Sequence, residues 1–202
     1  MVELYNLGGG FMHPILIMGI IGLAISLWKT FTLFKAGVNT GKFMADIRAS
    51  LKSGNVDQAL EKCESTSGPV ASVMHAGLVR AKDGVESAEK AIVSAGSLEM
   101  AFLERWMVWL GFIIVIAPLL GFTGTVWGMI VAFEDIKVQN DISPAVVAGG
   151  ISQALLTTLF GLIVAMVVQF FFNLATAKID SLIIDMEDAS AQLVDTLIEL
   201  KG

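Results

Sequence analysis

The chain has 202 residues, of which 55% are hydrophobic and only 16% are charged. Soluble domains carry roughly a quarter charged residues, so much of this chain does not face water. A single cysteine and two histidines exclude a disulfide framework and a Cys/His metal cluster. The net charge of −6 excludes a basic protein that binds nucleic acid.

Three segments contain no Asp, Glu, Lys or Arg, namely residues 4–28, 106–133 and 142–177. Each is longer than the roughly 20 helical residues that cross about 30 Å of hydrocarbon. The first segment lacks the basic leader and the small-residue cleavage site of a signal peptide, so we expect it to be retained. The pattern predicts an all-α integral membrane protein with three transmembrane helices in a lipid bilayer.

The distribution of Lys and Arg predicts the orientation, because these residues favour the cytoplasmic side. Residues 1–13 have none and the loop 134–144 has only Lys137, whereas residues 29–105 have ten. We therefore expect the following order along the chain: periplasmic N-terminus 1–13, transmembrane helix 14–29, cytoplasmic helical loop 30–105, transmembrane helix 106–133, periplasmic loop 134–144, transmembrane helix 145–177 and cytoplasmic helical tail 178–202.

The cytoplasmic parts have the apolar spacing of packed helices. In the long loop, apolar residues recur three and four apart, and Ser67-Gly68-Pro69 predicts a break between two helices. Residues 85–105 contain no Pro, so this helix is predicted to run straight into the second span. The third span is predicted to continue through the tail, whose apolar residues are Ile179, Leu182, Met186, Ala189, Leu193, Leu197 and Leu200. Two of the three transmembrane helices would thus be long and extend into the cytoplasm.

The second and third spans carry matching stripes of small residues, each with one threonine. The stripes, spaced i, i+4, i+7 and i+11, are Gly121, Thr125, Gly128 and Ala132, and Ala154, Thr158, Gly161 and Ala165. Small residues let transmembrane helices pack closely, which is one interpretation. The other is a lumen that accepts a polar group or another helix. The spacing alone leaves both open.

Gln153 and Thr157 are i, i+4 neighbours at the start of the third span. A buried glutamine needs a partner, so this face is expected to meet protein or water. Ser152 has no intramembrane base to activate it, so we do not expect an enzyme. Because no span contains a charged residue, a carboxylate that carries protons must come from another polypeptide.

Three segments resemble a known family. Residues 117–130 (APLLGFTGTVWGMI) and 150–162 (GISQALLTTLFGL) resemble the second-span and third-span signatures of the ExbB/TolQ/MotA proton-channel family. The segment GPV at 68–70, followed by HAGL at 75–78, resembles the family's cytoplasmic segment. The short chain and three spans favour the ExbB/TolQ branch over the four-span MotA branch.

The resemblance implies a homopentamer around a central pore in the bacterial inner membrane. An ExbD/TolR-type partner with a single span would place an intramembrane Asp in that pore. Ion flow would then drive mechanical work on an envelope client such as outer-membrane import. By motif match, Thr125 and Thr158 would face the pore beside that Asp, with Gln153 and Thr157 along the ion path. Gly121, Gly128, Ala154 and Gly161 would be close-packing residues.

Two positions depart from the family pattern. Gln153 stands where the family often has Glu, and Val167 stands where it often has Pro. Because glutamine does not titrate, the proton-relay role of that Glu is not carried over to Gln153. Gln153, Thr157 and Thr158 carry neutral oxygen atoms, which hard cations such as Na⁺ prefer as ligands. The transported ion is therefore expected to be H⁺ or Na⁺. No cofactor is expected. The alternative function is a passive membrane scaffold that conducts no ions.

Overall fold

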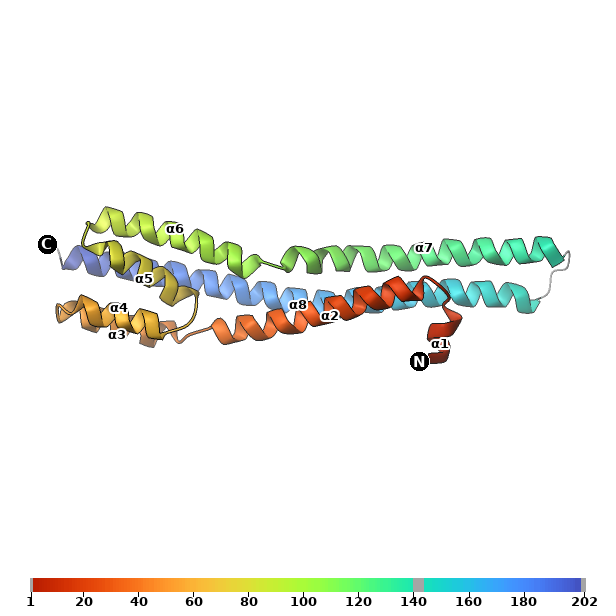
Figure 1. The fold of residues 1–202 in the computed structure, drawn as a ribbon, viewed down its shortest axis with the longest axis horizontal. Coiled ribbons are helices and arrows are strands. Elements are labelled where there is room, and N and C mark those ends of the chain that lie inside the picture. The colour runs from red at the N-terminus through yellow and green to blue at the C-terminus, as the bar shows by residue number, and fades with distance from the viewer. Residues whose placement is uncertain (1, 140–143, 201–202) are drawn as a thin grey trace. The chain divides into compact units, whose positions relative to one another are not determined.

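The computed structural model describes residues 2–139 and 144–200, and these residues contain helices and no strands (Figure 1). The helices are α1 (Val2–Leu7), α2 (Met12–Ala36), α3 (Thr40–Lys52), α4 (Val56–Ser65), α5 (Pro69–Ala81), α6 (Val85–Glu104), α7 (Met107–Gln139) and α8 (Pro144–Glu199). The chain divides into two compact units. Unit 1 comprises Met1–Thr30 and Trp106–Leu174, and unit 2 comprises Phe31–Arg105 and Ala175–Gly202.

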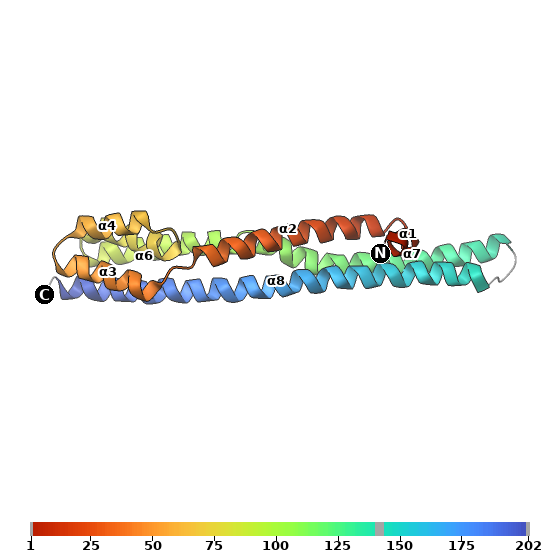
Figure 2. The same ribbon diagram turned by 90° about the horizontal axis from the view of Figure 1, so that it is seen from below.

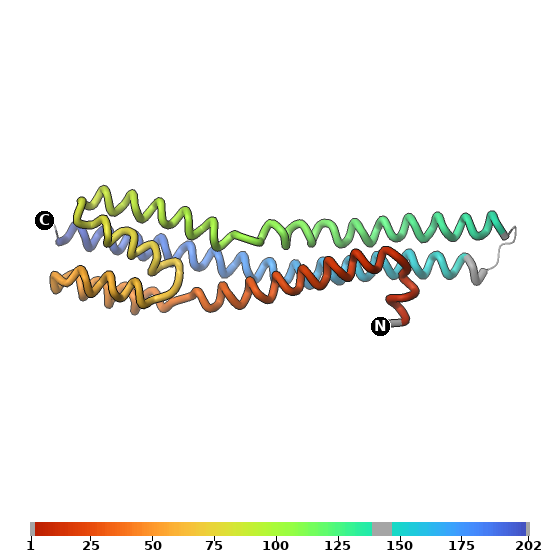
Figure 3. The backbone as a smooth tube through the Cα atoms, in the orientation of Figure 1, coloured from red at the N-terminus to blue at the C-terminus, as the bar shows by residue number. Residues whose placement is uncertain are grey.

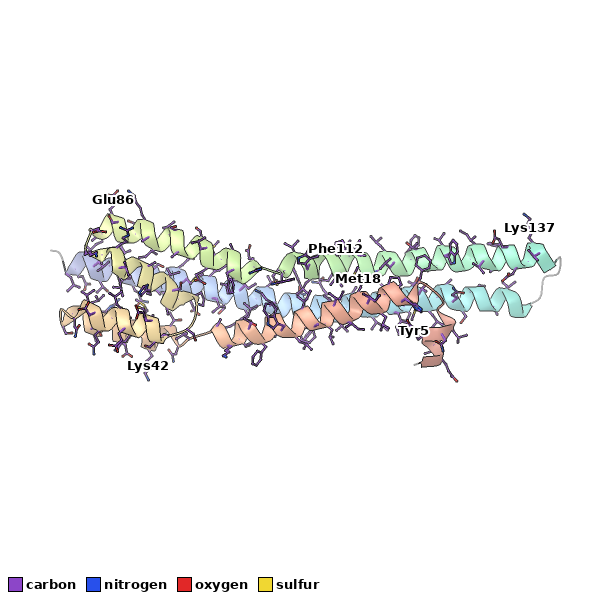
Figure 4. All side chains as sticks on the ribbon, viewed as in Figure 1. Tyr5, Met18, Lys42, Glu86, Phe112 and Lys137 are labelled. Atoms are coloured by element: carbon purple, nitrogen blue, oxygen red, sulfur yellow. The ribbon has the colours of Figure 1, made fainter. Side chains whose placement is uncertain are left out.

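In unit 1, α2 packs through a face repeated every three to four residues, on which Met12, Ile15 and Gly22 are buried. A Cβ atom at Gly22 would lie 2.8 Å from a methyl group of Val168 and 3.2 Å from one of Ile113. The absence of a side chain at Gly22 therefore lets α2 contact both other long helices. The short helix α1, which the sequence pattern did not predict, is joined to α2 by a hydrogen bond of 2.7 Å between Tyr5 Oη and His13 Nδ1 (Tyr5 is labelled in Figure 4).

The predicted continuous helix from residue 85 into the second span is wrong. α6 ends at Glu104 and α7 begins at Met107, and the smooth tube straightens between them (Figure 3). Arg105 has an extended ψ of 135°, and Trp106 has a φ of +76°. Neither value is helical, and a positive φ is unfavourable for a bulky residue. The Trp106 ring contacts Trp28 edge-on with centroids 6.2 Å apart, so a tertiary contact accompanies the break.

The helical organisation predicted for the loop and tail is present in unit 2 (Figure 2 shows the same ribbon turned by 90°). α4 ends at Ser65 and α5 begins at Pro69, which confirms the predicted break. Gly68 has a φ of +136°, and a Cβ there would lie 2.7 Å from the Ala36 carbonyl oxygen, so only glycine fits. The tail is part of α8, as predicted. Its buried apolar residues are Ile179, Leu182, Met186, Ala189 and Leu193, whereas Leu200 is exposed.

The charged side chains of unit 2 lie on its outer faces. Lys42 on α3 and Glu86 on α6 are both exposed (both are labelled in Figure 4). Glu86 accepts a hydrogen bond of 2.7 Å from Lys90 one turn later. This is the surface expected of helices that pack against one another in water.

Cys63 is buried in unit 2, and this burial has a measurable consequence. Burial, with a smaller contribution from neighbouring Glu64, raises the pKa of the thiol to about 11. At pH 8 nearly all of the thiol is neutral, and only the thiolate is a nucleophile. We expect iodoacetamide to alkylate folded Cys63 about 100-fold more slowly than the unfolded chain at pH 8. A mass-spectrometric time course with and without denaturant measures this ratio, and equal rates would contradict the buried position.

Candidate ion-conducting site

The small-residue stripes of α7 and α8 face each other within one chain, and the two helices run side by side in unit 1 (Figures 1 and 2). A Cβ atom added at Gly161 would lie 2.5 Å from the Ala117 carbonyl oxygen. One added at Gly121 would lie 2.8 Å from the Thr157 carbonyl oxygen. These neighbours are backbone atoms that cannot rotate away, so the two helix backbones are in direct contact.

The contact continues along α7 toward its C-terminal end. A Cβ atom at Gly128 would lie 3.1 Å from both the Ala154 nitrogen and the Gly150 carbonyl oxygen. Ala154 itself is 2% exposed. The four residues predicted to pack closely, Gly121, Gly128, Ala154 and Gly161, thus all lie in the contact between α7 and α8 of the same chain.

Thr125 and Thr158 meet where the two stripes cross. Their hydroxyl groups hydrogen-bond to each other. Thr125 Oγ1 also lies 3.2 Å from the carbonyl oxygens of Gly121 and Ala154, and Thr158 Oγ1 lies 3.2 Å from the Gly121 oxygen. Each hydroxyl carries one proton, so these carbonyls are alternative acceptors. Both threonines are half-buried. The result is a cluster of two hydroxyl and two carbonyl oxygens at the edge of the helix pair.

Such a cluster offers two kinds of chemistry. Hydroxyl groups can donate and accept, so they can stabilise either protonation state of a nearby carboxyl group. Neutral oxygens are also the ligands that hard cations prefer. The cluster contains no titratable group of its own, because residues 106–133 and 142–177 have no Asp, Glu, Lys or Arg.

Thr157, unlike Thr125 and Thr158, lies fully buried between α7 and α8. Thr157 is 1% exposed, and its hydroxyl donates to the Ala154 carbonyl oxygen at 2.8 Å. The Gly121 oxygen lies 3.3 Å away as a second acceptor. Thr157 therefore packs between α7 and α8 of this chain, and its predicted place along the ion path stays a prediction. A Cβ at Gly124 would lie 2.7 Å from Thr157 Cβ, so the fit is close.

Gln153 lies against the N-terminal segment. Its half-buried side chain occupies the space that a Cβ atom at Gly9 would fill. Gly9 has a φ of +69°, a conformation that glycine adopts readily. The glutamine therefore meets protein on at least one side, as expected for a polar residue in a span.

A polar pair that the sequence analysis did not single out, Gln169 and Asn173, lies on α8. Gln169 Nε2 donates a hydrogen bond of 2.7 Å to Asn173 Oδ1 on the outer surface of the helix. The sequence did contain a sign of this pair, since two amide side chains stand four residues apart in an uncharged segment. Residues at this spacing share a helix face and can contact each other.

Comparison with known proteins places these motifs in one family. The model of the MotA/TolQ/ExbB proton channel family matches residues 65–188, which include both threonines. The chain belongs to this family. The assignment agrees with the resemblance of the two span signatures, and the similar proteins below support the ExbB/TolQ branch.

Three relatives illustrate the similarity. An ExbB homologue described from Methanothermobacter thermautotrophicus is 31% identical over 180 residues, which cover 89% of this chain and 64% of the relative. The biopolymer transport protein ExbB of Salmonella typhimurium is 34% identical over 93 residues, which cover 46% and 38% of the two chains. The Tol-Pal system protein TolQ of Pseudomonas aeruginosa is 31% identical over 99 residues, covering 49% and 43%. The matches thus span less than two thirds of each relative's length.

Membership of the MotA/TolQ/ExbB family agrees with the predicted membrane architecture. In the described residues, α2, α7 and α8 each contain a stretch long and apolar enough to cross a membrane. For this part of the chain, the all-helical fold is confirmed, and its three long apolar helices fit the predicted transmembrane helices. Together these findings make the chain a multi-pass membrane protein of a proton-channel family.

Proposed function

We propose that this chain is the pore-forming subunit of an ion-driven motor. It forms a homopentamer around a central pore and works with an ExbD/TolR-type partner that has a single span. The complex converts proton or sodium flow across the inner membrane into mechanical work on an envelope client. The observation that carries the proposal is the Thr125–Thr158 oxygen cluster inside the two spans that match the proton-channel family.

In this proposal each part of the cluster has a separate role. The partner supplies an Asp, because the spans of this chain contain no acid. The Thr125 and Thr158 hydroxyls hydrogen-bond that carboxyl group as it gains and loses the ion. The glycine contacts at Gly121 and Gly161 hold α7 against α8 so that the two hydroxyls stay together. Gln153 contributes a neutral amide near the mouth of the path.

We further propose that the N-terminus and residues 134–144 face the periplasm, whereas residues 30–105 and the tail are cytoplasmic. The excess of Lys and Arg in residues 29–105 supports this orientation. The tail of α8 would then continue the third span into the cytoplasm, because α8 has no break between Pro144 and Glu199.

The test is ion flux through the reconstituted complex. The chain is co-purified with an ExbD/TolR-type single-span protein and placed in liposomes, and a second preparation in which the partner's intramembrane Asp is replaced by Asn is the control. We expect flux that needs both proteins and that Asp. Equal flux with the Asn variant, or none with the intact partner, would refute the motor.

The same liposomes distinguish the coupling ion. The neutral oxygens around Thr125 and the amide of Gln153 suit Na⁺ as well as a proton relay. Removing Na⁺ at constant pH separates the two ions. Unchanged flux means that the ion is H⁺, whereas loss of flux that returns with added Na⁺ means that it is Na⁺.

A further inference from the structure

The amide pair Gln169–Asn173 lies on the outer surface of α8 in unit 1. Asn173 is exposed and Gln169 is half-buried, and the hydrogen bond between them is 2.7 Å long. That bond uses one N–H of Gln169 and one lone pair of Asn173. Among the residues that the structure describes, no further bond to either amide is present, so three N–H groups and the Gln169 carbonyl remain available.

The pair lies within the uncharged segment 142–177, and the next charged residue is Lys178. Polar groups without partners are costly in hydrocarbon. Amides in a transmembrane helix therefore face protein or a water-filled cavity in preference to lipid tails. The outer surface of α8 at Gln169 and Asn173 is for this reason not expected to face lipid.

The amide pair shares a helix face with Thr158. Thr158, Leu162, Gln169 and Asn173 are spaced i, i+4, i+11 and i+15, which keeps them within about 60° of one another around the axis. At 1.5 Å per residue, Gln169 and Asn173 lie roughly 16 and 22 Å along α8 from Thr158, toward its C-terminal end. Val168 is 1% exposed and lies against α2, on another side of α8.

We propose that Gln169 and Asn173 form a second polar station of the ion path, where their amide oxygens hold the hydrated cation after it passes Thr125 and Thr158. This inference rests on the proposed function. The amides are neutral, so they can replace water molecules around a cation without trapping it as a carboxylate would. Their place on the C-terminal side of Thr158 corresponds to the cytoplasmic half of the proposed path.

Thiol labelling tests whether the positions of Gln169 and Asn173 are in contact with water. In a Cys63→Ser background, Gln169→Cys and Asn173→Cys are compared with Val167→Cys and Leu174→Cys. The native side chains of these two controls are 38% and 36% exposed and lie at least about 100° from both amides around the same helix. Inverted membrane vesicles that contain the complex are treated with a membrane-impermeant cationic methanethiosulfonate. Only ionised thiols react, and a thiol among lipid tails does not ionise.

We expect at least tenfold faster labelling at positions 169 and 173 than at 167 and 174. Labelling at 169 and 173 that is as slow as at the two controls would overturn the proposal. Having two test positions guards against one variant that fails to assemble, and co-purification with the partner checks assembly. This result does not depend on ion conduction.

Ion flux tests the role of the amide oxygens. Asn173→Leu and Gln169→Leu are expected to lower flux at least fivefold, whereas Val167→Leu leaves it unchanged. Rapid labelling combined with unchanged flux in both amide variants would overturn cation binding at the pair. If the unmodified complex conducts no ion at all, the proposed function fails. The labelling still decides whether water reaches the face of α8 that carries Gln169 and Asn173.

Discussion

Valine at Thr125 and Thr158 is expected to lower ion-driven flux at least tenfold while the complex still assembles. Valine keeps the shape of threonine but removes the hydroxyl. At these positions it removes the bond between the two side chains and their contacts with the Gly121 and Ala154 carbonyl oxygens. One such hydrogen bond contributes only about 1 kcal/mol to stability. The helix pair, which rests on backbone contact at the glycines, should therefore remain intact.

Thr123→Val is the matched control for these variants. Thr123 lies on the exposed face of α7, and its hydroxyl donates to the Leu119 carbonyl oxygen of its own helix at 2.8 Å. The control loses the same chemical group in the same span but should retain flux. Thr125→Ser, which restores the hydroxyl, should recover much of the activity. Full flux in the double valine variant would contradict a role of the two hydroxyl groups in the ion path.

Alanine at Gly161 is expected to destabilise the folded chain by about 1–3 kcal/mol, the usual cost of overpacking, and valine by more. The added Cβ atom would lie 2.5 Å from the Ala117 carbonyl oxygen and 3.2 Å from Gly121 Cα. Both neighbours are backbone atoms, so α7 and α8 must separate to relieve the contact. That separation would also pull Thr158 away from Thr125 and lower flux.

Gly111→Ala and Gly149→Ala provide the controls for this substitution. Both glycines lie in the same two helices, and a Cβ atom at either would meet nothing within 4 Å. Alanine has a higher helix propensity than glycine, so these controls should be neutral or slightly stabilising. The midpoint of thermal unfolding in detergent measures the difference. A Gly161→Ala midpoint equal to those of the controls would contradict the backbone contact.

The membrane architecture could be predicted because it follows from local sequence properties. Runs without charge indicate spans, and spacings of three and four residues indicate which sides pack. The stripes on α7 and α8 were therefore visible in the sequence. That they pack against each other within one chain was not, because spacing does not say which helix lies opposite.

The features that were missed depend on contacts between distant residues. Arg105 and Trp106 break a helix without Gly or Pro, and Trp106 packs on Trp28 from another helix. Thr157 and Thr158 are adjacent, yet one is buried and the other is half-buried because they differ by about 100° around the axis. Only the position of α7 distinguishes them.

The backbone contact at Gly161 also constrains how these spans can diverge during evolution. A larger residue at Gly161 is tolerated only if α7 shifts or changes opposite it, at Ala117 or Gly121. Substitutions at these three positions should therefore occur together in related sequences, whereas Gly111 and Gly149 should vary independently of them. Joint variation of this kind would record the packing of α7 on α8 in sequences that have otherwise diverged.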